Sequence, residues 1–136
     1  MQKNENKESQ YNYFGSNAKL EHIGFVIKSI EKYYPDVAIY TDPIQKVKVA
    51  FIVINGIKIE IVEPLEDCSP VNGYLNKGQN IYHLCFSVPD INESIIIARK
   101  YGFHCIAKPV EAVAFNNKKI AWLYNKNFGL FELVES

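Results

Sequence analysis

Cysteine is scarce in this sequence, and its placement excludes a disulfide framework. Three cysteines occur in 136 residues, an odd number, widely spaced and without a CxxC pair. A chain of this length buries about two-thirds of its unfolded surface and needs no covalent crosslinks to fold. Since the start of the sequence also shows no signal-peptide pattern, we expect a reducing, cytoplasmic location.

Two further absences exclude whole classes of partner. The formal net charge is zero and acidic and basic residues are interspersed, so no basic patch is available for nucleic acid or an anionic membrane. The longest apolar runs, such as residues 49–54, fall far short of the roughly 20 residues that a transmembrane helix needs. We therefore expect a soluble globular protein that binds neither nucleic acid nor a membrane.

What the sequence does contain is an internal repeat. His22 and the residues around it align with His83 and its neighbours at a spacing of 61 residues. A second match, at a spacing of about 71 residues, aligns Glu60 with Glu132. The chain therefore holds two copies of one module, each with a histidine on its first strand and a glutamate on its last.

The repeat divides the chain into a leader and one domain. Residues 1–17 are polar and aperiodic, which predicts a mostly disordered leader whose last aromatic residues could contact a neighbouring surface. Residues 18–136 are expected to form a single α+β domain of two βαβββ modules, at about 18–65 and 80–136.

Local signals support this module pattern. Ser29 is a suitable N-cap for a short helix, Asp90 and Glu93 form a capping-box pattern, and Asn55-Gly56 is a strong hairpin signal. Alternating apolar residues predict strands. The expected strands are 20–27, 37–41, 46–54, 57–62, 81–88, 103–108, 119–124 and 129–134.

Strand alternation places the repeated polar residues on a common face. If the sheet curls about a pseudo-twofold axis, the helix-side residues form the apolar cores and the opposite faces line one cup. His22, Glu60, His83 and Glu132 then converge. Two imidazoles and two carboxylates suit one divalent ion, with Ni²⁺ or Co²⁺ preferred and Zn²⁺ as the alternative. His104 has no repeat partner and is expected at the surface.

Several further segments belong to this pattern: Ile59-Glu60-Ile61-Val62-Glu63-Pro64, Ser69-Pro70, Lys77-Gly78, Tyr82-His83-Leu84-Cys85-Phe86-Ser87-Val88-Pro89-Asp90-Ile91 and Phe131-Glu132-Leu133-Val134-Glu135. Together they resemble the vicinal oxygen chelate (glyoxalase/bleomycin resistance/dioxygenase) superfamily from about residue 20 onward. Within it, the sequence is similar to short clostridial-type glyoxalase I and to methylmalonyl-CoA epimerase. The resemblance implies a curled mixed sheet around one metal, chelation of two substrate oxygens, removal of a proton alpha to a carbonyl, and a homodimer.

One departure separates the two relatives. By the resemblance, epimerases carry a second catalytic glutamate before the glutamine that begins the third strand, whereas Ile44 precedes Gln45 here. A glyoxalase needs one base, and Glu132 or Glu60 could serve. The expected function is therefore glyoxalase I-like (lactoylglutathione lyase-like) isomerisation of a 2-oxoaldehyde–thiol hemithioacetal through an enediolate, with the thiol carrier unassigned.

Other functions stay open. Epimerase-like racemisation of a 2-methyl acyl-CoA would need Glu111 or Lys58 as its second base. A metal-free small-molecule-binding or resistance module would not keep four ligands, and an Fe(II) extradiol dioxygenase would use two histidines and one carboxylate. Tyr82, directly before His83, is expected to point away from the cup.

Overall fold

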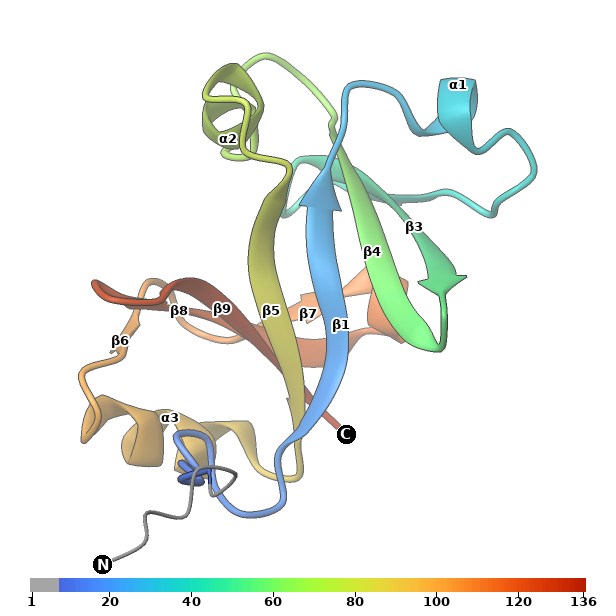
Figure 1. Ribbon diagram of the computed structural model, residues 1–136. Helices are drawn as coiled ribbons and strands as arrows, with labels where there is room; N and C mark the ends of the chain where they lie inside the picture. Colours follow the sequence, from blue (N-terminus) through green and yellow to red (C-terminus); the bar gives the residue numbers. More distant parts are fainter. Residues whose placement is uncertain (1–7) are drawn as a thin grey trace, which may run out of the picture.

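The computed structural model describes residues 8–136, so positions 1–7 of the expected leader lie outside the described residues. Nine strands form one curled, open, mixed sheet in the order β2-β3-β4-β1-β5-β9-β8-β6, with β7 paired to β8 (Figure 1). The helices are few and short, which confirms the expected α+β class. In this part of the chain no helix combines the length and the apolar composition of a membrane span.

The element order follows the repeat. The first module contains β1 (Lys19–Val26), α1 (Ile30–Tyr33), β2 (Tyr40–Asp42), β3 (Val47–Ile54) and β4 (Ile57–Pro64). After α2 (Asn72–Asn76), the second contains β5 (Ile81–Val88), α3 (Ile91–Arg99), β6 (His104–Cys105), β7 (Val110–Ala112), the 3-10 turn η1 (Val113–Phe115), β8 (Lys118–Asn125) and β9 (Gly129–Glu135).

Strand pairing gives the sheet its pseudo-twofold symmetry. Within the first module β1 pairs with β4 in parallel, and within the second β5 pairs with β9 in parallel. The two modules join where β1 runs antiparallel to β5. The first and last strands of each module therefore occupy the centre of the sheet (Figure 1).

Most of the local signals are confirmed. The side chain of Ser29 accepts a hydrogen bond from the Lys32 N–H, and that of Asp90 accepts from the Glu93 N–H, so both helices begin at the expected caps. Asn55-Gly56 joins β3 to β4 with φ angles of 48° and 83° at the two positions, as a type I′ hairpin turn requires.

Two edge strands differ from the prediction. The strand expected at 37–41 begins only at Tyr40, and that expected at 103–108 keeps only His104 and Cys105. After Pro109 the chain forms β7 and η1, two elements that the sequence analysis did not predict. Residues of both elements line the cup. Edge strands depend on one neighbour for pairing, so alternation alone defines their bounds poorly.

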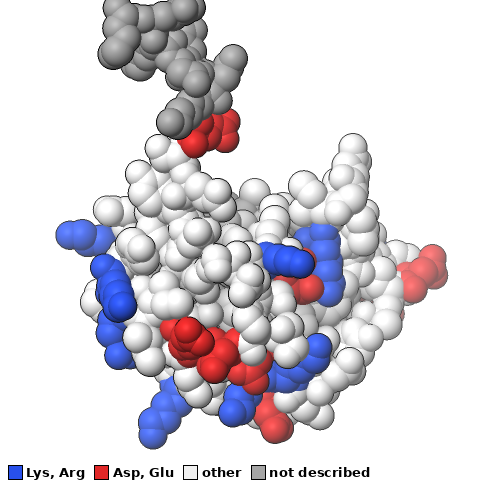
Figure 2. Space-filling view, turned by 90° about the horizontal axis from the view of Figure 1, so that it is seen from below, with Lys and Arg blue, Asp and Glu red and all other residues white. Residues whose placement is uncertain are grey.

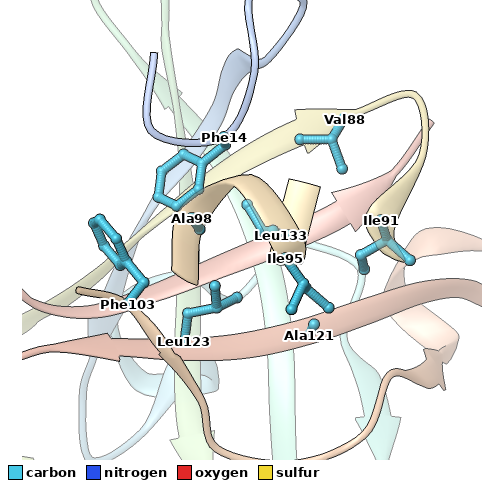
Figure 3. Close-up of a cluster of buried hydrophobic side chains, with 9 residues drawn as sticks. All are labelled: Phe14, Val88, Ile91, Ile95, Ala98, Phe103, Ala121, Leu123 and Leu133. Atoms are coloured by element: carbon cyan, nitrogen blue, oxygen red, sulfur yellow. The ribbon is translucent and has the colours of Figure 1, made fainter. Parts of the chain in front are cut away.

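The apolar cores lie on the helix side of each half-sheet, as expected. In the second module α3 packs on β8 and β9, and Phe14 inserts beside it (Figure 3). The carbonyl of Phe14 accepts a hydrogen bond of 2.9 Å from the Ser94 hydroxyl. Part of the segment expected as a leader is thus packed against α3. The buried cluster comprises Phe14, Val88, Ile91, Ile95, Ala98, Phe103, Ala121, Leu123 and Leu133.

Surface charge is mixed in sign. Figure 2 shows acidic and basic side chains interspersed over one face of the molecule, without a large block of either sign. This face therefore offers no basic stripe of the kind that binds a nucleic-acid backbone.

Candidate metal centre

The four repeated polar residues meet in the middle of the sheet. His22 comes from β1, Glu60 from β4, His83 from β5 and Glu132 from β9, and all four are at most 5 % exposed. One ligand atom from each lies within 4.8 Å of all the others. The structure therefore brings together every residue that the sequence nominated for the metal.

The spacing of these atoms fits a shared ion. The Nε2 atoms of His22 and His83 are 3.1 Å apart. Glu132 Oε1 lies 3.1 Å from His22 Nε2 and 3.2 Å from His83 Nε2. Glu60 Oε1 lies 3.5 Å from each. Ligands about 2.1 Å from one ion lie about 3.0–3.4 Å apart at neighbouring positions. Glu132 Oε1 also lacks good hydrogen-bond geometry, so these atoms converge on a common point rather than on one another.

The electrostatics of the metal-free site favour charged side chains. Burial alone would lower the pKa of His22, but hydrogen bonds with the Cys85 thiol and the nearby carboxylates outweigh it and raise that pKa. Burial alone would raise the pKa of Glu132, yet the two histidines beside its carboxylate hold that pKa at about 2. Glu132 is therefore a carboxylate at neutral pH, as a metal ligand has to be.

A β-bulge adds a carboxylate behind His22. Between β1 and β5, Leu20 pairs with Phe86 while His22 pairs with Cys85, which leaves Glu21 as the extra residue. Glu21 accepts a hydrogen bond of 3.1 Å from His22 Nδ1 when that nitrogen carries the proton. This contact leaves Nε2 free for a metal, as in carboxylate–histidine–metal arrangements.

Lys58 completes this outer contact. Its Nζ lies 3.0 Å from Glu21 Oε1 and 4.5 Å from the centre of the Phe51 ring. The hydrogen bonds from His22 lower the pKa of Glu21, and those from Lys58 add to the effect. Glu21 escaped prediction because alternation assigns it to the opposite face.

A second bulge corrects the prediction for Tyr82. Gly24 pairs with His83 and Phe25 with Ile81, so Tyr82 is the extra residue on β5 and turns into the cup instead of away from it. Its ring centre lies 4.4 Å from that of His83. Gly24 lets the His83 ring lie directly on the backbone of β1, because any side chain there would overlap the ring.

The His/Glu quartet borders an apolar cavity of about 400 Å³ through its two glutamates. Glu60 and Glu132 line it, and its walls are largely aliphatic and aromatic, including Val49, Tyr82 and Trp122. Cavities of about 300–1,000 Å³ with few polar groups are typical of small-molecule sites. No lysine, arginine or histidine lines this one within the described chain.

Asp42 is a cavity residue that the sequence analysis missed. It lies on β2, is 4 % exposed and lines the cavity together with Gln45, whose Oε1 accepts a hydrogen bond of 3.1 Å from Trp122 Nε1. The available signal was Asp-Pro, a turn-initiating pair whose aspartate binds the following backbone amides. Ile44, between them in sequence, is 63 % exposed and lies outside the cavity.

The other nominated residues lie elsewhere. Glu111 is exposed on β7, and neither it nor Lys58 lines the cavity. His104 is exposed on β6, which confirms the prediction of a surface histidine.

Comparison with protein families settles the ancestry of this site. Residues 21–122 match the model of the glyoxalase/bleomycin resistance protein/dioxygenase superfamily. The chain belongs to this superfamily. The sheet order and the two modules are thus those of a vicinal oxygen chelate domain, which confirms the resemblance.

Individual relatives point in one direction within the superfamily. The chain is 33% identical to the uncharacterized protein YqjC of Bacillus subtilis over 129 residues, 86% of this chain and 91% of that one. It is 26% identical to human mitochondrial methylmalonyl-CoA epimerase over 131 residues, 87% of this chain and 74% of the relative. The epimerase match supports the epimerase alternative better than the glyoxalase I function expected from the sequence.

A solved structure agrees in fold. A variant of Streptomyces coelicolor methylmalonyl-CoA epimerase, in complex with 2-nitronate-propionyl-CoA, superposes with a TM-score of 0.71 at 23% identity. The match covers 87% of this chain and 94% of that one. The curled sheet of two modules is therefore shared over nearly the whole length of both chains.

Proposed function

We propose that this protein is a divalent-metal-dependent enzyme that epimerises a 2-methyl acyl-CoA thioester, in the manner of a methylmalonyl-CoA epimerase. The observation that supports it is the buried quartet of two imidazoles and two carboxylates at the floor of an apolar cavity. The relatives named above favour an acyl-CoA over a hemithioacetal as the substrate.

The size of the cavity fits the acyl group rather than the whole substrate. About 400 Å³ encloses a branched acyl head and the start of its thioester arm, and leaves the nucleotide of coenzyme A outside. The aliphatic wall excludes water from the reacting carbon. Exclusion of water strengthens every charge interaction at the floor of the cavity.

His22, Glu60, His83 and Glu132 would hold the ion. A bound divalent cation would chelate two substrate oxygens and make the α-proton more acidic by stabilising the enolate charge. Four protein ligands close a tetrahedral zinc site, whereas an ion that accepts six keeps two positions for substrate, so we infer Ni²⁺ or Co²⁺ before Zn²⁺.

Proton transfer falls to the carboxylates. Glu132 lines the cavity and is a carboxylate at neutral pH, so it has an oxygen lone pair to accept a proton. Glu60 lines the same floor and is the alternative base. In this proposal Glu132 removes the α-proton from one face of the substrate, and the hydrogen bond from His22 to Glu21 holds the imidazole in its ligating orientation.

The experiment compares two substrates on one preparation. The protein is freed of metal, loaded in turn with Ni²⁺, Co²⁺ and Zn²⁺, and assayed with single epimers of methylmalonyl-CoA and with the glutathione hemithioacetal of methylglyoxal. We expect metal-dependent epimerisation and no turnover of the hemithioacetal. Turnover of the hemithioacetal without epimerisation would restore the glyoxalase I function, and inactivity on both would refute the proposal.

A further inference from the structure

We propose that Asp42 is the second proton-transfer group of this site, acting on the face of the α-carbon opposite to Glu132. The inference rests on the epimerase function proposed above and adds a catalytic residue to it. It also accounts for a site in which Ile44, at the position expected for a second glutamate, does not line the cavity.

Inversion at carbon requires proton transfer on two faces. The C–H bond breaks on one face, a carboxylate takes the proton, and the bonding electrons move into the thioester carbonyl to give an enolate. A carboxylic acid on the other face then delivers its proton to the same carbon, and the carbonyl re-forms. No oxidation occurs, and exchange with solvent resets the two carboxyl groups.

The cavity offers few groups for the second step. Its ionisable lining residues in the described chain are the carboxylates Asp42, Glu60 and Glu132 and the phenols of Tyr74 and Tyr82. Glu60 and Glu132 belong to the buried quartet with His22 and His83. Asp42 is the carboxylate that comes from a strand without a metal ligand.

Local structure fixes the orientation of Asp42. Its Oδ1 accepts hydrogen bonds of 3.0 Å from the backbone N–H groups of Ile44 and Gln45. Among the described residues no hydrogen bond engages Oδ2, although the side chain is 4 % exposed and lines the cavity. One oxygen therefore anchors the carboxylate while the other is available to a substrate.

The turn that carries Asp42 is tied to the metal centre. Gln45 Oε1 accepts a hydrogen bond from the indole N–H of Trp122, which crosses from the first module to the second. Trp122 is paired with Glu132 across β8 and β9, and its ring lies 4.7 Å from that of His83. This contact holds the Asp42 turn over the same cavity whose floor carries Glu132.

The earlier candidates do not share this placement. Glu111 is exposed and Lys58 Nζ is engaged by Glu21, so neither reaches the cavity. Glu111 supplies a matched control, because a change there alters a carboxylate on the same protein without touching the site.

The test compares the metal-loaded wild type with the metal-loaded Asp42→Asn variant, which keeps the Oδ1 acceptor. For each epimer of methylmalonyl-CoA separately, it measures epimerisation and exchange of the α-proton in D₂O. We expect epimerisation to fall at least about 100-fold in the variant. The epimer whose α-proton faces Glu132 should still exchange that proton within about 10-fold of the wild-type rate, with retention of configuration. Exchange without inversion is an outcome that a merely structural role would not produce.

Further measurements complete the test. Glu132→Gln should show the mirror pattern, with exchange confined to the other epimer, while Glu111→Gln and Ile44→Val should behave as wild type. Bound metal and thermal unfolding of Asp42→Asn should match the wild type. Normal epimerisation by Asp42→Asn, or equal loss of exchange for both epimers, would overturn the assignment. Wild-type protein that neither exchanges nor epimerises would refute the proposed function itself, and the inference with it.

Discussion

Replacing His83 by alanine should uncouple the stability of the protein from divalent metal. A ligand that binds only the folded state stabilises it by about 2.7 kcal/mol at about 100 times its dissociation constant. The unfolding entropy of 136 residues is about 0.29 kcal/mol per kelvin. Saturating metal should therefore raise the melting temperature of the wild type by about 9 °C.

The variant loses one of four ligand atoms. Outer contacts of metal ligands are worth about 10- to 100-fold in affinity, so the loss of a ligand itself should cost at least about 100-fold. At the same metal concentration the stabilisation then falls to about 0.4 kcal/mol, and the melting shift to about 1 °C. Scanning fluorimetry with and without Co²⁺ measures both shifts, and His104→Ala, at an exposed histidine, is the control. A full metal-dependent shift in His83→Ala would refute the assignment of the site.

Three more outcomes are expected. Glu21→Gln should weaken metal binding about 10-fold or more, because His22 loses its charged partner. Glu31→Gln, at an exposed position, should leave metal binding unchanged. Competition with a fluorescent chelator measures the metal affinity of both variants. In metal-free protein the pKa of Glu132 is lower in the folded state than in the unfolded state, which stabilises the fold by about 3 kcal/mol above pH about 4.5. This stabilisation is lost as the pH falls toward 2. Denaturation at several pH values should show that loss in the wild type and not in Glu132→Gln; equal slopes would contradict it. We also expect a homodimer, which sedimentation equilibrium tests and a monomer would exclude.

The quartet of His22, Glu60, His83 and Glu132 could be predicted because it depends on two regular patterns, the internal repeat and the alternation of side chains along each strand. His22 and His83 occupy equivalent places in a repeat, and strand alternation alone assigns each to a face. Glu60 and Glu132 follow from the same rule on the last strand of each module. In a regular strand, side chains alternate between the two faces with a period of two residues. That period is enough to predict which side chains share a face of the sheet.

The remainder of the site could not be predicted, because it depends on departures from regularity. Glu21 and Tyr82 are the residues directly before the two histidines, and each is the extra residue of a bulge that turns it toward its histidine. A bulge depends on the pairing with a neighbouring strand, which one strand's sequence does not reveal. Asp42 lines the cavity because the curled sheet brings β2 close to η1, whose Ala114 and Phe115 line the same cavity. This proximity depends on the tertiary structure and not on the local sequence.

The two modules meet through β1 and β5, and each supplies one imidazole and one carboxylate to the centre. Neither half alone has enough ligands for a tight site, since a chelating centre needs three or four. If the chain were cleaved between β4 and β5, the ion would act as a crosslink whose strength depends on metal concentration and pH. Two separately produced fragments, ending before and beginning after α2, should then reassemble when Ni²⁺ or Co²⁺ is added and separate when a chelator removes it, a behaviour suited to a metal-controlled split reporter.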